Sequence, residues 1–215
     1  REHCPAIEVE IIDVLDKTNA LFRISYTLGY SFLVRRAAFL WWLGFWITDS
    51  KLLRAFTSPI VSIINRINTK QFARFLIQRN PDAIVSTHFL PSQITSHLKE
   101  TKKIKSKLVT IVTDFGVHSF WVSPHTDFYV VASQFTKKQL ALKGIPEEMI
   151  KELGIPIDTK FLIQHDKVGL YTKFDIDESK FTVLIMTGSF GLGPLEQIVN
   201  ALYRDVQILV VCASN

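Results

Sequence analysis

The sequence predicts an α/β protein in which helices cover both faces of parallel sheets. Short apolar runs of strand length alternate with helix-length segments along most of the chain, an order typical of parallel sheets in doubly covered folds. The runs are nearly continuous in apolar residues, as expected for strands buried on both faces. Hydrophobic residues make up 47% of the 215 residues and charged residues only 21%, which excludes a disordered chain.

The composition also limits the setting in which the protein works. Lys and Arg number 25 against 20 Asp and Glu, a net charge of +5, and aromatic residues make up 12%. A basic, aromatic-rich surface favours contact with an anionic interface. The two cysteines, Cys4 and Cys212, lie near opposite ends of the chain, which excludes a disulfide scaffold and favours a reducing, cytosolic setting.

The first elements are a strand and a long aromatic segment. Ile7, Val9 and Ile11 alternate with glutamates, which predicts a half-buried strand. Residues 18–48 are rich in Phe, Tyr, Trp and Leu, but their longest uncharged run, residues 37–48, is about half of the roughly 20 residues that span a bilayer.

Two interpretations of the aromatic segment remain open. It is either a core helix or an interfacial segment that enters the headgroup region of a membrane. The second interpretation rests on Arg35 and Arg36 beside Trp41, Trp42 and Trp46, because tryptophan and basic residues are typical of membrane interfaces.

Local signals define the remaining elements. Ser58 and Pro59 resemble a cap and a first helical residue, and Asn80-Pro81 ends that helix. Ser133 precedes another helix, which ends at Gly144. We expect helices at residues 59–79, 91–99, 134–143 and 194–203, a helical turn at 146–149, and strands at 83–86, 108–113, 127–132, 150–153, 182–187 and 207–211.

A polar, turn-rich stretch over residues 155–180 separates two α/β units. We therefore expect one domain over residues 1–157 and the start of a second over residues 158–215. Because the chain opens at Arg1 within an element and stops where an apolar strand has just ended, we expect it to be an internal fragment of a longer protein.

The glycine-rich stretch from Gly188 to Pro194 follows a strand and opens a helix. Small residues there let backbone N–H groups approach a phosphate, and a helix N-terminus attracts negative charge. The stretch matches neither the dinucleotide fingerprint nor the P-loop. It is either a diphosphate-binding loop or a plain tight turn.

Two further motifs follow strand ends, where open parallel sheets bind ligands. The segment from Thr113 to His118 could orient or deprotonate a hydroxyl through Asp114 and His118, or Asp114 could simply cap a helix. His88 follows another strand, where a lone histidine is more often structural. No Cys/His spacing suggests a metal site, and no nucleic-acid-binding motif accompanies the lysines of residues 99–107.

These motifs together resemble the family of monogalactosyldiacylglycerol synthases and processive diacylglycerol glucosyltransferases. The resemblance covers nearly the whole chain, and its blocks are specific jointly rather than singly. They are Pro81 to His88, Val112 to Val122 with its Thr-Asp-Phe, His and Trp, Asp127 to Ser133, Gly154-Ile155-Pro156-Ile157 with Phe161, and Gly188 to Pro194.

The resemblance implies a GT-B enzyme, with a Rossmann-like N-terminal domain that here lacks its first strand and the beginning of a second Rossmann-like domain. Such an enzyme is an inverting, metal-independent glycosyltransferase that moves a hexose from a UDP-sugar to diacylglycerol. The N-terminal domain would hold the acceptor at an anionic membrane, which implies a peripheral protein on the cytoplasmic face. A UDP-sugar would be the co-substrate, and no cofactor is expected.

Residue roles carry over only where the motifs match. The resemblance gives acceptor-side roles to His88, Thr113, Asp114, His118 and Trp121, diphosphate binding to Gly188, Ser189, Phe190, Gly191, Leu192 and Gly193, and membrane contact to Arg35, Arg36, Trp41, Trp42 and Trp46.

The family's proposed base is a histidine in a glycine-rich loop that lies outside this chain, so the catalytic base is unassigned and this chain alone is expected to be inactive. Glucose and galactose remain open as the sugar. Two other functions also remain: a non-catalytic membrane-surface module and another nucleotide-binding Rossmann enzyme.

Overall fold

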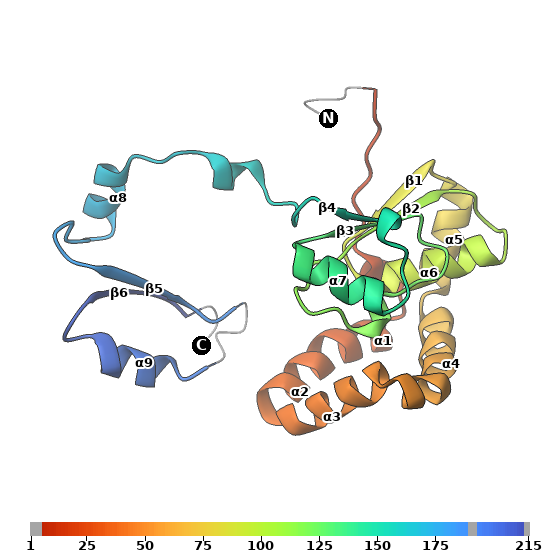
Figure 1. The fold of residues 1–215 in the computed structure, drawn as a ribbon, viewed down its shortest axis with the longest axis horizontal. Coiled ribbons are helices and arrows are strands. Elements are labelled where there is room, and N and C mark those ends of the chain that lie inside the picture. Colours follow the sequence, from red (N-terminus) through yellow and green to blue (C-terminus); the bar gives the residue numbers. More distant parts are fainter. Residues whose placement is uncertain (1–5, 189–192, 213–215) are drawn as a thin grey trace. The chain divides into compact units, whose positions relative to one another are not determined.

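The computed structural model describes residues 6–188 and 193–212 (Figure 1). The chain divides into two compact units, Arg1–Pro156 and Ile157–Asn215. This division lies one residue from the boundary expected from the sequence. The role expected for each unit remains a prediction.

The first unit is built on a four-stranded parallel sheet in the order β1-β2-β3-β4 (Figure 1). The predicted α/β class with parallel strands is therefore confirmed. Helices α6 and α7 connect β1 to β2 and β3 to β4, as the alternation predicted. The bounds are β1 Ala83–Ser86, α6 Phe89–Glu100, β2 Lys107–Ile111, β3 Phe128–Val131, α7 Gln134–Leu142 and β4 Ile150–Glu152.

Two apolar clusters form the core of this unit. The first gathers side chains of β3, β4 and α7 around the buried indole of Trp121. The second joins α6 to helix α5, Lys70–Arg79. The fully buried members include Trp121, Tyr129, Leu90, Leu140, Val112 and Val131.

The predicted caps of α7 are confirmed. The Ser133 hydroxyl oxygen accepts the backbone N–H of Thr136 at 3.4 Å at the start of the helix. Gly144 follows its end with φ +93°, a conformation that glycine adopts without strain. The predicted turn at residues 146–149 is the 3₁₀ helix η4, Glu147–Met149.

The strand expected around Ile7, Val9 and Ile11 is wrong. These residues form no ladder, and the Ile11 side chain is 94% exposed. Alternation marks a potential strand, but a strand also needs a neighbour to pair with, and the residues that the structure describes provide none here. The segment is instead fastened by the carboxylate of Glu10, which accepts a hydrogen bond from Arg79 at 2.9 Å.

The helix start expected at Ser58-Pro59 is also wrong. Helix α4 runs over Lys51–Asn68 and contains Pro59 in its interior. A proline inside a helix removes one backbone donor and strains the preceding turn. Helix α4 nevertheless continues through Pro59, and apolar residues recur at helical spacing on both sides of it. The break comes at Thr69, between α4 and α5, and α5 ends at Asn80 in the left-handed conformation.

The aromatic segment forms a chain of helices ahead of α4. Its elements are η1 Val14–Lys17, α1 Ala20–Ile24, the π-helical turn η2 Ser25–Gly29, α2 Tyr30–Arg36 and α3 Ala38–Asp49. Helix α2 packs against α3, and α3 against α4. Among the helices of the described ranges, none combines the length and apolar character needed to cross a membrane.

The second unit contains a two-stranded parallel sheet, β5 Thr182–Met186 and β6 Gln207–Val211, connected by α9 Leu195–Leu202. These three elements were predicted. The stretch before them, expected to be turn-rich, also holds the 3₁₀ helix η5 Thr159–Leu162 and a short helix α8, Lys167–Lys173. Helix α8 starts where the Asp166 carboxylate accepts the N–H groups of Val168 and Gly169.

Candidate functional site

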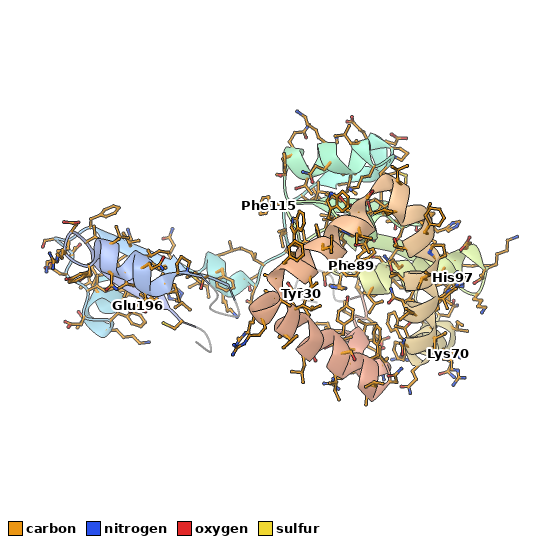
Figure 2. The ribbon with its side chains drawn as sticks, turned by 90° about the horizontal axis from the view of Figure 1, so that it is seen from below. Tyr30, Lys70, Phe89, His97, Phe115 and Glu196 are labelled. Atoms are coloured by element: carbon orange, nitrogen blue, oxygen red, sulfur yellow. The ribbon has the colours of Figure 1, made fainter. Side chains whose placement is uncertain are left out.

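The predicted acceptor-side residues lie at one edge of the first unit's sheet. His88 follows β1 and Asp114 follows β2, and these parallel strands pair side by side with Ser86 opposite Thr110. The strands therefore bring the two loops together, as their positions in the sequence predicted. The side chains of Phe89 and Phe115, next to His88 and Asp114 in the chain, mark these loops in Figure 2.

His88 both caps α6 and faces the polar edge. Its Nδ1 accepts the backbone N–H of Leu90 at 3.2 Å. The neutral ring therefore carries its hydrogen on Nε2. Burial lowers the pKa of His88, although the carboxylates of Asp114 and Asp13 act in the opposite direction. At neutral pH His88 is thus an uncharged ring that can donate a hydrogen bond from Nε2.

His118 is a structural histidine. Its Nδ1 accepts the N–H of Phe120 at 3.1 Å, and its Nε2 donates to the Phe45 carbonyl at 3.1 Å. The ring lies 4.3 Å from the Phe45 ring, centroid to centroid. Burial lowers its pKa, against the Phe45 carbonyl and the carboxylate of Asp49, which raise it. Because both nitrogens are engaged, His118 fastens α3 to the sheet unit through the 3₁₀ helix η3, Ser119–Trp121, and neither nitrogen is left for proton transfer.

Asp114 presents a carboxylate at the same edge. One oxygen accepts the indole N–H of Trp121 at 2.9 Å, and the side chain as a whole is exposed. Trp121 itself is only 1% exposed and belongs to the core. The indole therefore orients the carboxylate rather than contacting a ligand with its face. Thr113, which is partly buried, lies two residues beyond the end of β2 and immediately precedes Asp114.

A second anchor joins the aromatic helices to the sheet. The Asp49 carboxylate, at the end of α3, accepts the Ser119 N–H at 2.7 Å, the Ser119 hydroxyl at 2.6 Å and the Lys143 ammonium at 2.8 Å. Burial alone would raise the pKa of Asp49, but these hydrogen bonds outweigh it and lower the pKa to about 2. The charged network holds α3 against η3 and the end of α7.

Tyr26 is a candidate site residue that the sequence did not predict. It lies in the π-helical turn η2, a rare geometry that often marks functional positions. Its ring packs edge-on against His88 with the centroids 6.0 Å apart, and burial raises the pKa of its hydroxyl. No sequence spacing predicts a contact between Tyr26 and His88, which are 62 positions apart. Only the aromatic composition of residues 18–48 indicated that this segment could be functional.

The helices α1 to α4 carry many exposed apolar side chains. Trp42 and Trp46 are each 54% exposed, and no residue of α1, η2, α2 or α3 is buried. The interpretation of residues 18–48 as a core helix is therefore not supported within the described structure. The exposed apolar side chains between residues 21 and 67 are Leu21, Ile24, Leu28, Tyr30, Phe32, Phe39, Leu40, Trp42, Phe45, Trp46, Leu52, Leu53, Phe56, Ile60, Ile63, Ile64 and Ile67.

The predicted membrane-contact residues lie on these helices. Arg35 and Arg36 end α2 and are exposed. Trp41 is partly covered because its ring stacks on Phe45 at 5.2 Å. The structure thus brings together basic and aromatic side chains, whereas contact with lipid stays a prediction.

The predicted diphosphate loop is only partly within the described structure. Ser189, Phe190, Gly191 and Leu192 lie outside the described residues, while Gly188 and Gly193 flank them with φ +76° and +138°. Such backbone angles strain any other residue. A cavity of about 500 Å³ lies at the N-terminal end of α9, lined by Gly193, Pro194, Leu195, Glu196, Gln197 and Cys212.

Over residues 6–188 and 193–212, no group of three His, Cys, Asp or Glu side chains is arranged to hold a metal ion. The polar side chains that gather in the first unit are His88, Asp114 and Tyr26. This set can hydrogen-bond a hydroxyl-bearing ligand beside an apolar surface.

Comparison with known proteins gives a family match for the first unit. The sequence model of monogalactosyldiacylglycerol (MGDG) synthase matches residues 1–157. Those residues coincide, within one position, with the first compact unit.

Curated relatives match over more of the chain. Processive diacylglycerol β-glucosyltransferases of Bacillus cereus (strain AH187) and Bacillus thuringiensis (strain Al Hakam) are each 29% identical to this chain over 205 residues. The alignments cover 94% of this chain and 49% of each relative, so the chain spans about half the length of the curated relatives it matches. Among solved structures, the apo form of the lipopolysaccharide outer core galactosyltransferase WaaB aligns at a TM-score of 0.41 and 13% identity, over 66% of this chain and 39% of that one.

Proposed function

The chain belongs to the monogalactosyldiacylglycerol synthase family, and we propose that it forms the acceptor-binding part of an inverting GT-B glycosyltransferase. In this proposal residues 1–157 hold diacylglycerol at a membrane, and residues 158–215 begin the domain that binds a UDP-hexose. The relatives named as β-glucosyltransferases favour glucose over galactose as the sugar.

The observation that carries the proposal is the junction of a polar sheet edge with an exposed apolar layer. Diacylglycerol has one hydroxyl and two acyl chains, so its site must present hydrogen-bonding groups beside apolar surface. Tyr26 contacts His88, and Phe45 contacts His118. These contacts join the strand-end loops directly to the helices that expose Trp42 and Trp46.

The chemistry of the polar edge suits acceptor positioning. His88 holds its hydrogen on Nε2 and so donates to the acceptor's oxygen rather than taking its proton. The exposed carboxylate of Asp114, oriented by Trp121, can accept the hydrogen bond of the same hydroxyl. We therefore assign both residues to acceptor binding. Deprotonation of the hydroxyl would need another base, because neither His88 nor His118 is placed to take the proton.

The second unit would supply the first donor contacts. The stretch from Gly188 to Gly193 would face the diphosphate, with the N-terminal end of α9 stabilising the departing UDP. Glu196, in the first turn of α9 (Figure 2), has the wrong charge for a diphosphate but can accept hydrogen bonds from sugar hydroxyls. The proposal assigns no metal and no cofactor to the reaction.

Membrane attachment would use the aromatic helices. Arg35 and Arg36 would meet anionic headgroups, and Trp41, Trp42 and Trp46 would enter the interface. The protein would then be peripheral, on the cytoplasmic face, with diacylglycerol reaching the polar edge from the bilayer. Salt-sensitive binding to anionic vesicles is expected, and equal binding to neutral vesicles would count against it.

The test is a glycolipid assay on the full-length protein with UDP-glucose or UDP-galactose and diacylglycerol in vesicles. Asp114→Asn should lower kcat/KM for diacylglycerol by about 10- to 100-fold, the loss expected for a hydrogen bond to a charged group. His88→Gln should lower it by about 2- to 10-fold, the loss expected for one hydrogen bond between neutral groups. The matched control, Asp158→Asn, removes an exposed carboxylate of the second unit and should leave the rate unchanged. Equal rates in all variants would remove the sheet edge from the acceptor site.

Two further outcomes separate the alternatives. Gly191→Val should abolish UDP-sugar binding in the full-length protein, and unchanged binding would remove the glycine loop from the donor site. Vesicle binding without any glycosyl transfer would favour a non-catalytic membrane module. We also propose that this chain alone is inactive, since it spans about half the length of the relatives, and glycolipid formation by it would contradict that.

A further inference from the structure

A second cavity lies in the first unit, away from the polar sheet edge. It has a volume of about 230 Å³, room for roughly eight waters at about 30 Å³ each, and lies among α4, α5 and α6. Its apolar floor is made by Ala73, Ile77, Ile94 and Leu98, and its polar lining by Arg66, Thr69, Lys70, Arg74, His97 and Lys103.

The cationic side chains of this cavity have little to neutralise them. Within the described part of the chain, no ion-pair partner is recorded for Lys70, Arg74 or Lys103. The helix dipole favours cations at the C-terminal end of a helix and disfavours them at the N-terminal end. Lys70 lies in the first turn of α5, so the dipole does not account for its position.

The fourth cation, Arg66, is held by a contact with a histidine. Its guanidinium lies 3.3 Å from Nε2 of His97, while Nδ1 of His97 lies 3.2 Å from the carboxylate of Glu100. The ring therefore accepts from Arg66 and donates to Glu100, and Glu100 is turned toward the histidine. Figure 2 shows Lys70 and His97 on the helices that border this cavity.

We propose that this cavity binds a phosphate group. Four cations around one small cavity repel one another until an anion enters, and a phosphate carries about 1.5 to 2 negative charges at neutral pH. Arg66 and Arg74 offer the planar forks that match phosphate oxygens, and Lys70 and Lys103 add compact charges at the rim. A carboxylate would neutralise only one of the four cations.

This phosphate site is separate from the acceptor edge. His88 precedes the first turn of α6 and His97 lies in its last turn, nine residues further on, or about 14 Å along the axis. The exposed Ile63, Ile64 and Ile67 of α4 adjoin Arg66 in the chain. The same cations would recognise the phosphate of a lipid headgroup or a soluble phosphate. The inference does not depend on whether the chain acts on diacylglycerol.

Lysine acetylation followed by mass spectrometry localises the binding. With millimolar inorganic phosphate, or with a short-chain phosphatidic acid below its micelle concentration, Lys70 and Lys103 should lose reactivity at least threefold. The exposed Lys138 and Lys151 should keep theirs. Protection by inorganic phosphate identifies a soluble ligand, and protection by the short-chain lipid alone identifies a headgroup. No protection by either, or equal protection of Lys138, would overturn the proposal.

Charge-matched variants complete the test. Each variant is titrated with inorganic phosphate and with the short-chain phosphatidic acid, and calorimetry gives the Kd. The double variant Lys70→Gln/Arg74→Gln should raise the Kd for the bound probe at least tenfold. The control Lys138→Gln/Lys151→Gln removes the same net charge outside the cavity and should change the Kd less than twofold. Because all four positions are exposed, loss of folding is not expected, and circular dichroism checks it. Equal Kd values for the two double variants would show non-specific charge attraction and contradict the proposal.

Discussion

Replacing Asp49 by Asn should loosen the aromatic helices from the sheet. The carboxylate of Asp49 accepts two hydrogen bonds from Ser119 and one from Lys143, and so ties the end of α3 to η3 and α7. Asparagine keeps the shape and one acceptor oxygen but removes the charge that Lys143 faces. The substitution therefore tests the electrostatic part of the anchor with little change in packing.

The magnitude follows from the pKa of Asp49. The folded-state pKa is about 2 against an ordinary 3.8, and a difference of nearly two units corresponds to about 2 kcal/mol. The side chain is 36% exposed, so solvent screening reduces the expected loss to about 1 kcal/mol. A lowered carboxylate pKa stabilises the fold above the unfolded-state value, and this contribution disappears as pH falls from about 4 to about 2.

Urea unfolding of the wild type and Asp49→Asn measures the effect. The difference in unfolding free energy should be about 1 kcal/mol at pH 7, constant down to about pH 5, and smaller below pH 4. Asp16→Asn is the matched control, because Asp16 forms an ion pair with Arg23 in which both side chains are 56% exposed; its loss should stay below about 0.5 kcal/mol. Equal effects of the two substitutions at pH 7 would refute the anchor.

Three further predictions concern separate parts of the chain. Burial lowers the pKa of His118 and so favours its neutral form in the fold; stability should therefore fall as pH drops below about 6.5, and His118→Gln should flatten that slope in urea unfolding between pH 7 and 5.5. Trp42→Ala with Trp46→Ala should weaken anionic-vesicle binding about 10- to 100-fold and change stability by less than about 1 kcal/mol, whereas the buried Trp121→Ala should cost about 3–5 kcal/mol on thermal unfolding. Gly188→Ala should destabilise the second unit by about 1–2 kcal/mol, because alanine is strained at φ +76°. Faster proteolysis of the second unit in the variant than in the wild type would measure this loss.

The sheet was predictable because burial on both faces leaves a continuous signature. The run from Leu108 to Ile111 is apolar except for Thr110, and it lies in β2, an inner strand that pairs on both sides. Caps are equally local, so Ser133 and Gly144 identified the ends of α7. By contrast, Ile7 to Ile11 carried the pattern of a strand without a partner, and pairing is a non-local property that alternation alone does not encode.

Part of the site followed from position, and part did not. Strand ends meet at one edge of a parallel sheet, so the sequence placed His88 and Asp114 at the same edge. The structural role of His118 depends on Phe45, which is 73 residues away in the chain. The contact of Tyr26 with His88 depends on a π-helical turn, and the phosphate cavity depends on three helices packing together. Such contacts have no spacing signature in a single sequence.

The central claim is that the first unit carries the acceptor site, and photo-crosslinking tests it most directly. A diacylglycerol with a photoreactive acyl chain is incorporated into vesicles, irradiated with the full-length protein, and its attachment sites are mapped by mass spectrometry. The account predicts crosslinks within residues 21–67 and 113–121, reduced by excess unlabelled diacylglycerol. Crosslinks confined to residues 157–215, or unaffected by that competitor, would contradict it.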